Sequence, residues 1–373
     1  MPTLAEKLRI LHFINEARWS NDNKEGRRPI NLHPNFSTLS NQEEALLLTH
    51  ALCYISNRQM NPNKVFQDGG YVYSYIVWDY YTNPPRSVID ILNGVFTTLP
   101  DGYRLKVSST EFSSRFMPTD IVCIYKTLTT LDTTYKRSFA DFIKTAISGK
   151  SVGARIDDLT EKLYDLIYSN VGTVKWAAIL GATGKIDASK VAGIKSAKTT
   201  GFKRFEGSKR VWCTVRDYLR SQVVELSPSL TLKEAFRTVS GITLLPSDLE
   251  HLEVPGDLWN NNDTFKACFW GTGTKSALSG TGTLPKQIRD YWTGISAPKP
   301  FIPEDYDSTF YLVRRLCEIN ECKSICPFSS TPNHAKDMCH STGGKLCPVV
   351  KVCSGYSYKC KNPNDCELKK LLL

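Results

Sequence analysis

Three side chains have the type and setting that acid, base or nucleophilic chemistry requires. Asp257 follows Pro255 and Gly256, which fix a tight bend that can present the carboxylate at a helix start facing a cleft. It could also simply cap that helix. Asp217 lies in a predicted helix, where its alternative is a salt bridge within its own helix. Lys209, with other cations nearby, could act as a nucleophile, and its alternative is a plain phosphate contact.

The segment 199–221 has the features of an anion-binding turn. Gly207 lets the backbone approach a phosphate, and the free amides of the following helical turn point at the anion. A helix-hairpin-helix unit grips a nucleic-acid backbone in this way. The residues expected at the backbone are Lys203, Arg204, Gly207, Ser208 and Arg210. The alternative is an amphipathic helix with a solvated basic rim, whose apolar side contains Val211, Trp212, Val215, Tyr218 and Leu219.

Eight of the twelve cysteines gather in the last 57 residues. They are Cys317, Cys322, Cys326, Cys339, Cys347, Cys353, Cys360 and Cys366. Thiolates at such short spacings predict two four-cysteine zinc sites, or one 4Fe-4S cluster and one zinc site, and the spacings favour zinc. Metal binding would supply folding energy to this small polar segment. The other four cysteines, Cys53, Cys123, Cys213 and Cys268, are expected to be buried thiols.

Composition favours an anionic partner and a cytoplasmic protein. The 373 residues include 47 Lys and Arg against 37 Asp and Glu. Ten of these basic residues, with only three acids, fall between Lys185 and Arg220. No apolar run approaches the ~20 residues that span a bilayer, and the first residues lack the features of a secretory signal. We therefore expect a cytoplasmic monomer that binds nucleic acid and no membrane.

Hydrophobic periodicity and caps predict a mostly helical protein. The expected helices are 4–19, 41–56, 64–81, 86–99, 119–131, 135–148, 155–169, 173–180 and 231–240. Ser40 or Asn41 is expected to cap the second of these helices, and Thr119 the fifth. The connector 181–201 is expected to order only when anions bind. Three parts follow: an N-terminal helical lobe (1–150), a helix-hairpin-helix DNA-binding and catalytic lobe (151–310) and a cysteine-rich metal-binding module (311–373).

A helical chain with a basic hairpin entry at Gly207-Ser208-Lys209, a later Pro-Gly-Asp and a C-terminal cysteine cluster resembles the helix-hairpin-helix DNA glycosylases. Several short stretches are more similar to one phage and bacterial branch of that superfamily, the alpha-glutamyl/putrescinyl thymine pyrophosphorylase family. They are Ser56–Met60, Gly69–Tyr71, Arg115–Asp120, Lys209–Trp212 and Arg216–Leu219. This resemblance extends over most of the chain and implies a two-lobed helical fold.

The hairpin departs from the usual pattern of that superfamily. The usual Leu-Pro-Gly-x-Gly is replaced by Lys203–Gly207, and no Asp follows at ~20 residues. Position for position, only Gly207 and Lys209 match, and Lys209 stands where enzymes that also nick the strand keep their lysine. Asp257 lies some 50 residues further along the chain.

The resemblance implies that a modified base is turned out of duplex DNA into a pocket and excised. The expected pocket residues are Arg58, Gln59, Tyr71 and Tyr75, although such an aromatic stripe can equally belong to the core. Asp257 or Asp217 would stabilise the positive charge that develops on the sugar, or Lys209 would form an imine with it. The implied partner is double-stranded phage DNA with hypermodified or glucosylated bases, and the implied role is antiviral defence.

Two other functions fit the same sequence. One is a transferase of the same family, which attaches an amino acid or polyamine to an activated thymine in DNA and leaves no abasic site. The other is a zinc-stabilised DNA-binding protein without catalytic activity. Tight binding without base release would distinguish this last function from the glycosylase.

Overall fold

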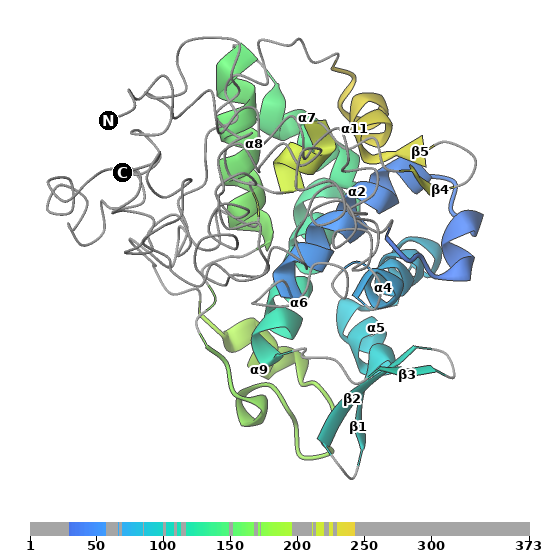
Figure 1. Ribbon diagram of the computed structural model, residues 1–373. Helices are drawn as coiled ribbons and strands as arrows, with labels where there is room; N and C mark the ends of the chain where they lie inside the picture. Colours follow the sequence, from blue (N-terminus) through green and yellow to red (C-terminus); the bar gives the residue numbers. More distant parts are fainter. Residues whose placement is uncertain are drawn as a thin grey trace, which may run out of the picture. The chain divides into compact units, whose positions relative to one another are not determined.

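The computed structural model describes one mostly helical unit, and all of its described residues lie within Arg28–Leu249. The described residues are 30–56, 66, 69–84, 86–99, 102–107, 110–112, 117–148, 152–167, 171, 173–195, 211, 214–219, 224–226 and 230–242. The predicted helical class is confirmed for them (Figure 1). The hairpin bend near Gly207 and the cysteine-rich tail lie outside the described residues.

Helix α2 (Gln42–Cys53) lies at the centre of this unit. Every residue from Ala45 to Cys53 is buried, and α2 contacts α4 (Gly70–Thr82), α7 (Phe139–Ile147) and α11 (Leu232–Ser240) (Figure 1). A fully buried leucine contributes ~1.5–3 kcal/mol of transfer free energy, so the leucines of α2 contribute heavily to the stability of the unit. Asn41 occupies the predicted cap position but makes no side-chain capping hydrogen bond.

The N-terminal edge of the unit packs against the start of α4. The 3-10 helix η1 (Pro34–Thr38) follows His33, whose backbone N–H donates to Ser74 Oγ at 2.7 Å. Gly70 at the start of α4 lies so close to this segment that a Cβ there would be 2.6 Å from Ile30 Cγ2. A second short 3-10 helix, η2 (Tyr54–Ser56), continues α2.

A small antiparallel sheet follows α5 (Val88–Val95). Strands β1 (Phe96–Leu99), β2 (Gly102–Val107) and β3 (Thr110–Phe112) pair in the order β1-β2-β3. The predicted helix 86–99 was therefore wrong beyond Val95, where α5 gives way to β1. Pro100 and Asp101 come between β1 and β2 in the sequence, ahead of Gly102, and helical periodicity does not take into account that such residues favour a turn.

Helices α6 (Pro118–Tyr135), α7 and α8 (Val152–Ile167) pack against one another. Met117, not Thr119, is the N-cap of α6, and Thr119 Oγ1 instead accepts a hydrogen bond from Val174 N at 3.1 Å. Contact between α7 and α8 crosses the expected lobe boundary at residue 150, and the division into lobes stays a prediction.

The segment 173–195, which includes much of the predicted connector, contains short regular elements. It contains the 3-10 helix η4 (Trp176–Ala178), an antiparallel bridge between Leu180 and Ile186, and α9 (Ala188–Gly193). The structure describes residues 181–195 of this connector, and the dependence of its order on anions stays a prediction. The predicted helix 173–180 was too long, because only its 3-10 turn forms.

The last described elements are β4 (Val224–Leu226), β5 (Leu230–Thr231) and α11. Thr231 and Glu234 form a capping box at the start of α11, and Gly241 ends the helix with a φ of 68°. The predicted helix 231–240 is confirmed.

Candidate functional site

A buried polar cluster surrounds Asp217, one of the two predicted catalytic carboxylates. Its Oδ2 atom lies 3.1 Å from His50 Nε2 and accepts a hydrogen bond from the Tyr54 hydroxyl at 2.8 Å. Its Oδ1 atom accepts a hydrogen bond from Arg216 Nε at 3.0 Å. The side chains of Asp217 and Arg216 are only 3% and 7% exposed, so this ion pair is shielded from water. We name these four residues the Asp217 cluster.

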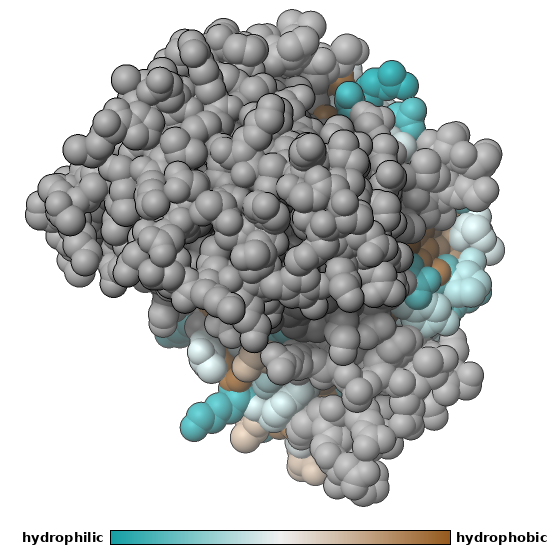
Figure 2. All heavy atoms as spheres, viewed as in Figure 1, coloured by the Kyte–Doolittle hydropathy of each residue, from teal (hydrophilic) through white to brown (hydrophobic). Residues whose placement is uncertain are grey.

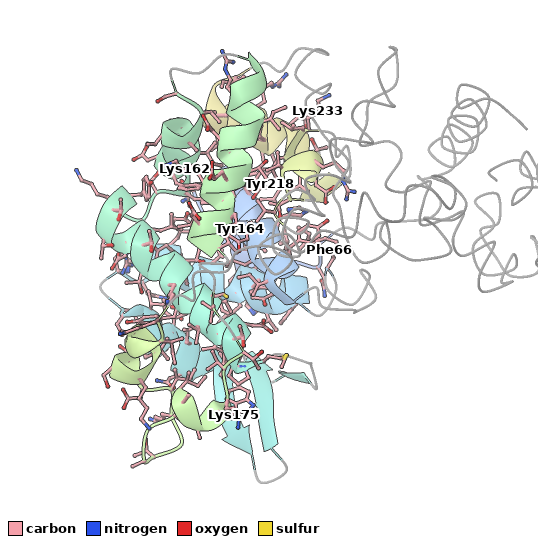
Figure 3. The ribbon with its side chains drawn as sticks, turned by 90° about the vertical axis from the view of Figure 1, so that its left-hand side faces the viewer. Phe66, Lys162, Tyr164, Lys175, Tyr218 and Lys233 are labelled. Atoms are coloured by element: carbon pink, nitrogen blue, oxygen red, sulfur yellow. The ribbon has the colours of Figure 1, made fainter. Side chains whose placement is uncertain are left out.

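The elements that build the cluster come from opposite ends of the described unit's sequence. His50 lies in the last turn of α2, Tyr54 begins η2, and Asp217 belongs to the helical residues 214–219. The hydroxyl of the adjacent Tyr218 donates to the Leu47 carbonyl, which fixes this helix against α2. Figure 3 shows Tyr218 close to α2.

The helix containing Asp217 buries the apolar side that periodicity predicts. Val211, Val215, Tyr218 and Leu219 are all at most 2% exposed. The Tyr218 ring stacks on Phe236 of α11 with ring centroids 5.7 Å apart. The predicted burial of this apolar side is confirmed. The buried side holds the helix in place and so keeps Asp217 beside its hydrogen-bond partners.

Aromatic rings enclose one side of the cluster. Phe66 stacks on His50 at 5.5 Å with an interplanar angle of 13° and meets Tyr54 edge to face at 5.5 Å. The rings exclude water, which strengthens electrostatic interactions within the cluster. Since an ionised carboxylate only accepts hydrogen bonds, we assign a proton to Nε2 of His50.

This arrangement can hold a negative charge in a fixed position. Arg216 balances the charge of the carboxylate, and the two donors at Oδ2 orient it. Preorganised groups in a water-poor site stabilise a developing opposite charge without reorganising. The same four residues also make a structural ion pair, because a buried carboxylate requires such partners.

The other predicted catalytic and backbone-binding residues lie outside the described residues. These are Asp257, Lys209, Lys203, Arg204, Gly207, Ser208 and Arg210. The predicted pocket residues Arg58 and Gln59 and all eight cysteines of the tail lie outside them as well. Asp217, Tyr71 and Tyr75 are the predicted site residues that the described part of the chain contains.

Tyr71 and Tyr75 lie together on α4 against His33. Each tyrosine ring meets the His33 ring edge to face, with centroids 4.9 Å apart, and Trp78 stacks on it at 6.3 Å. His33 Nδ1 accepts from Asn35 N at 3.2 Å, so its ring orientation is fixed. Burial lowers the pKa of His33 and is the main cause that raises the pKa of Tyr75. The two tyrosines are half-buried, as befits either a stacking surface or an outer layer of the core.

The sequence did not single out His50 and Tyr54 as partners of Asp217. The available signal was a histidine and a tyrosine four residues apart, which follow a run of apolar residues. Arg216 is one of the basic residues that surround the apolar side of this helix, but it is 6% exposed and paired with Asp217, so it does not lie on a solvated rim. This pair is the salt bridge within its own helix that was the alternative for Asp217.

The described part of the chain contains neither a metal-binding group nor a membrane-spanning helix. Among its residues, no group of three or more His, Cys, Asp or Glu side chains is placed to bind a metal ion. None of the helices described is both long and apolar enough to span a bilayer. Cys53 and Cys123 are buried, as predicted, whereas Cys213 and Cys268 lie outside the described residues.

Comparison of this chain with protein-family models, with curated proteins and with solved structures finds no match.

Proposed function

We propose that this protein is a DNA glycosylase that excises a hypermodified or glucosylated nucleobase from phage DNA and so leaves abasic sites as an antiviral defence. The observation that supports it most is the Asp217 cluster: a predicted catalytic carboxylate, oriented by His50 and Tyr54, on the helix that directly follows the basic segment 199–210. The backbone contact and the acid would thus come from adjacent pieces of the chain.

The chemistry follows from the charge that develops on the sugar. As the glycosidic bond breaks, the deoxyribose ring becomes positively charged, and a nearby carboxylate stabilises it. Asp217 is the candidate for this role, because His50 and Tyr54 fix its Oδ2 atom before the reaction begins. Preorganisation of this kind lowers the barrier because no donor has to turn during the reaction.

The remaining parts of the site are assigned from the sequence. Gly207 and its basic neighbours would hold the phosphates, and Tyr71 and Tyr75 would stack on the extruded base. The eight cysteines of the tail would bind zinc, or a 4Fe-4S cluster and zinc, as a structural module. The half-buried rings of Tyr71 and Tyr75 are compatible with a stacking surface.

An assay for abasic sites tests this function directly. Purified protein is incubated with genomic DNAs that carry different modified bases and with unmodified DNA, and aldehyde-reactive abasic sites are counted. The proposal expects abasic sites on at least one modified DNA and none on unmodified DNA. A transferase would leave no abasic site and would need a pyrophosphate-bearing base together with an amine co-substrate.

A second candidate function is a DNA-binding protein without catalysis, stabilised by zinc. It is favoured by the Arg216–Asp217 ion pair, because a carboxylate balanced by a buried arginine is a common structural arrangement. Tight binding to all the DNAs in the assay above, with no abasic sites on any of them, would establish this second function in place of the first.

A further inference from the structure

Residues 173–195 form an exposed basic surface, which we name the basic platform. It contains four lysines and one aspartate, a formal charge of +3. The lysines are Lys175, Lys185, Lys190 and Lys195, and all four are exposed. Where Figure 1 draws α9 and its flanking loops, Figure 2 shows hydrophilic side chains together with hydrophobic ones at the surface.

The platform is folded by its own backbone hydrogen bonds. Gly181 N donates to the Lys185 carbonyl at 2.8 Å, and Asp187 N donates to the Ile179 carbonyl at 2.8 Å, on either side of the bridge between residues 180 and 186. Gly184 completes the turn with a φ of 73°, a conformation that glycine adopts without strain. These hydrogen bonds fix the backbone around Lys185.

Asn93 of α5 anchors the platform to the rest of the unit. Its Nδ2 atom donates to the Ile186 carbonyl at 3.0 Å, and its Oδ1 atom accepts from Ile186 N at 2.8 Å. One amide side chain therefore satisfies both backbone groups of a residue 93 positions away. The platform keeps its position relative to α5 because of this pair of hydrogen bonds.

The one acidic residue of the platform is engaged in local capping. Asp187 Oδ1 accepts hydrogen bonds from the Ser189 hydroxyl at 2.6 Å and from the backbone N–H groups of Ser189 and Lys190 at 2.9 and 3.1 Å. The Ser189 hydroxyl, followed by the Lys190 N–H, lowers the pKa of Asp187. Its charge is thus directed at the start of α9, and the side chains of Lys175, Lys185 and Lys195 are exposed.

We propose that the basic platform binds the sugar-phosphate backbone of duplex DNA, next to the predicted hairpin. This inference rests on the proposed function in that it takes DNA as the partner. Exposed lysines can contact the phosphates of DNA, and a folded platform loses little conformational entropy on binding. The platform also leads directly in sequence into the segment 196–210, which adds five more Lys and Arg residues against one acid.

A membrane surface is a poorer partner for the platform. Peripheral membrane binding combines basic residues with exposed large apolar side chains that enter the lipid. Among the described residues, Met117 is the large hydrophobic side chain that is exposed, and it lies outside the platform. Binding of the protein to anionic phosphatidylserine vesicles through these lysines, with no binding to DNA, would contradict the proposal.

The test compares two triple-lysine variants of the full-length protein by fluorescence anisotropy with a labelled duplex. The first variant changes Lys175, Lys185 and Lys195 to alanine and keeps Lys190, whose Nζ atom donates to the Leu180 carbonyl. The matched control changes Lys144, Lys162 and Lys233, which are also exposed. Lys162 and Lys233 lie at the opposite end of the unit from Lys175 (Figure 3).

The platform variant should bind at least about tenfold more weakly at ~0.1 M salt, and the slope of log K against log salt should fall by about 2 to 3, since each lost phosphate contact removes about 0.9. The control variant should change the affinity by less than about threefold. Equal effects of the two variants would show a solvated basic surface and overturn the proposal.

A variant that keeps every lysine tests whether the fixed position of the platform matters. Asn93→Ala removes both hydrogen bonds to Ile186 and leaves the charge unchanged. DNA affinity should fall by about threefold or more while the Tm changes little, since Asn93 is part-buried at the edge of the unit. Unchanged affinity would contradict a preformed surface.

The outcomes separate this inference from the proposed glycosylase. Wild-type protein that binds DNA through the platform but forms no abasic sites contradicts only the glycosylase. Abasic sites formed by a platform variant with normal DNA affinity contradict only the platform. A wild-type protein that does not bind DNA at low salt contradicts both.

Discussion

His50 Nε2 and Asp217 Oδ2 lie 3.1 Å apart although the two residues are 167 positions apart in the chain. Both side chains are nearly inaccessible to water, at 2% and 3% exposure. This contact fixes the helical residues 214–219 against the end of α2. It therefore links the stability of the unit to the orientation of the carboxylate that we propose as the catalytic group.

The hydroxyl of Tyr54 should contribute more to stability than an ordinary buried hydroxyl. Tyr54→Phe removes a 2.8 Å hydrogen bond to the charged Asp217, which should lower the free energy of unfolding by ~1.5–3 kcal/mol. The matched control is Tyr80→Phe, whose hydroxyl donates to the neutral Leu128 carbonyl at 3.3 Å and should cost ~1 kcal/mol or less. Urea unfolding of both variants measures the difference, and a larger cost at Tyr80 would contradict the charge-assisted bond.

Gly70 should not tolerate a side chain, whereas Gly69 should tolerate one. A Cβ at Gly70 would meet Ile30 Cγ2 at 2.6 Å and the backbone of Asn31 at 3.2 Å, so Gly70→Ala should destabilise the protein by ~1–3 kcal/mol. At Gly69 the nearest atom, Tyr73 Cε2, is 3.6 Å away, and Gly69→Ala should be neutral or stabilising. Thermal unfolding of the two variants measures this difference. Equal Tm values for both variants would contradict the close approach of Gly70 to Ile30 and Asn31.

The side chain of Arg137 makes several hydrogen bonds, whereas its backbone has a left-handed conformation that is unfavourable for residues other than glycine. Its guanidinium donates to the carbonyls of Tyr80 and Arg86 and pairs with Asp132, while its φ is 68°. Arg137→Ala should lower the free energy of unfolding by ~1–3 kcal/mol through the lost hydrogen bonds. Arg137→Gly loses the same bonds but accepts the positive φ, so it should be ~1 kcal/mol more stable than the alanine variant. The reverse order in denaturant unfolding would contradict the left-handed backbone.

His33 should make the protein less stable in mild acid. Burial lowers its pKa below the ordinary 6.5, so the unfolded chain takes up the proton at a higher pH than the folded chain does. The stability that neutral His33 contributes is complete above pH 6.5 and declines as the pH falls from 6.5 toward the lowered pKa. His33→Asn keeps a capping acceptor but cannot gain this proton.

The measurement for His33 is Tm at pH 7.5 and at pH 5.5 for the wild type and for His33→Asn. The drop in Tm between the two pH values should be smaller in the variant. Other histidines contribute equally to both proteins, so the difference isolates His33. A drop of the same size in both proteins would show that His33 gains its proton equally well in the folded state.

The helices were the predictable part of this fold. Apolar spacing placed α6, α8 and α11 to within a few residues, because this signal is local. Strands β1 to β3 were missed, since Phe96 and Leu99 continue the helical spacing of the apolar residues of α5. Pairing with β2 is a tertiary contact, and it overrides local preference.

The candidate site was predictable only in its central residue. Asp217 was identified as a carboxylate in a predicted helix, and the buried side of that helix was predicted by the spacing of Val211, Val215 and Tyr218. The partners His50 and Tyr54 belong to a helix more than 160 residues earlier. No local pattern relates the two segments, because their contact depends on how α2 packs in the core.

Single-turnover base release by Asp217→Asn is the most direct test of the central claim, that the Asp217 cluster supplies the carboxylate for base excision. The control is Asp79→Asn, which alters another buried carboxylate, 1% exposed and paired with Arg86. Both variants should remain folded by near-ultraviolet circular dichroism and should bind duplex DNA. We expect Asp217→Asn to release base at least ~100-fold more slowly than the wild type, as for loss of a preorganised electrostatic group, and Asp79→Asn to keep the normal rate. Normal base release by a folded Asp217→Asn variant, with the loss found instead in Asp257→Asn, would contradict the account.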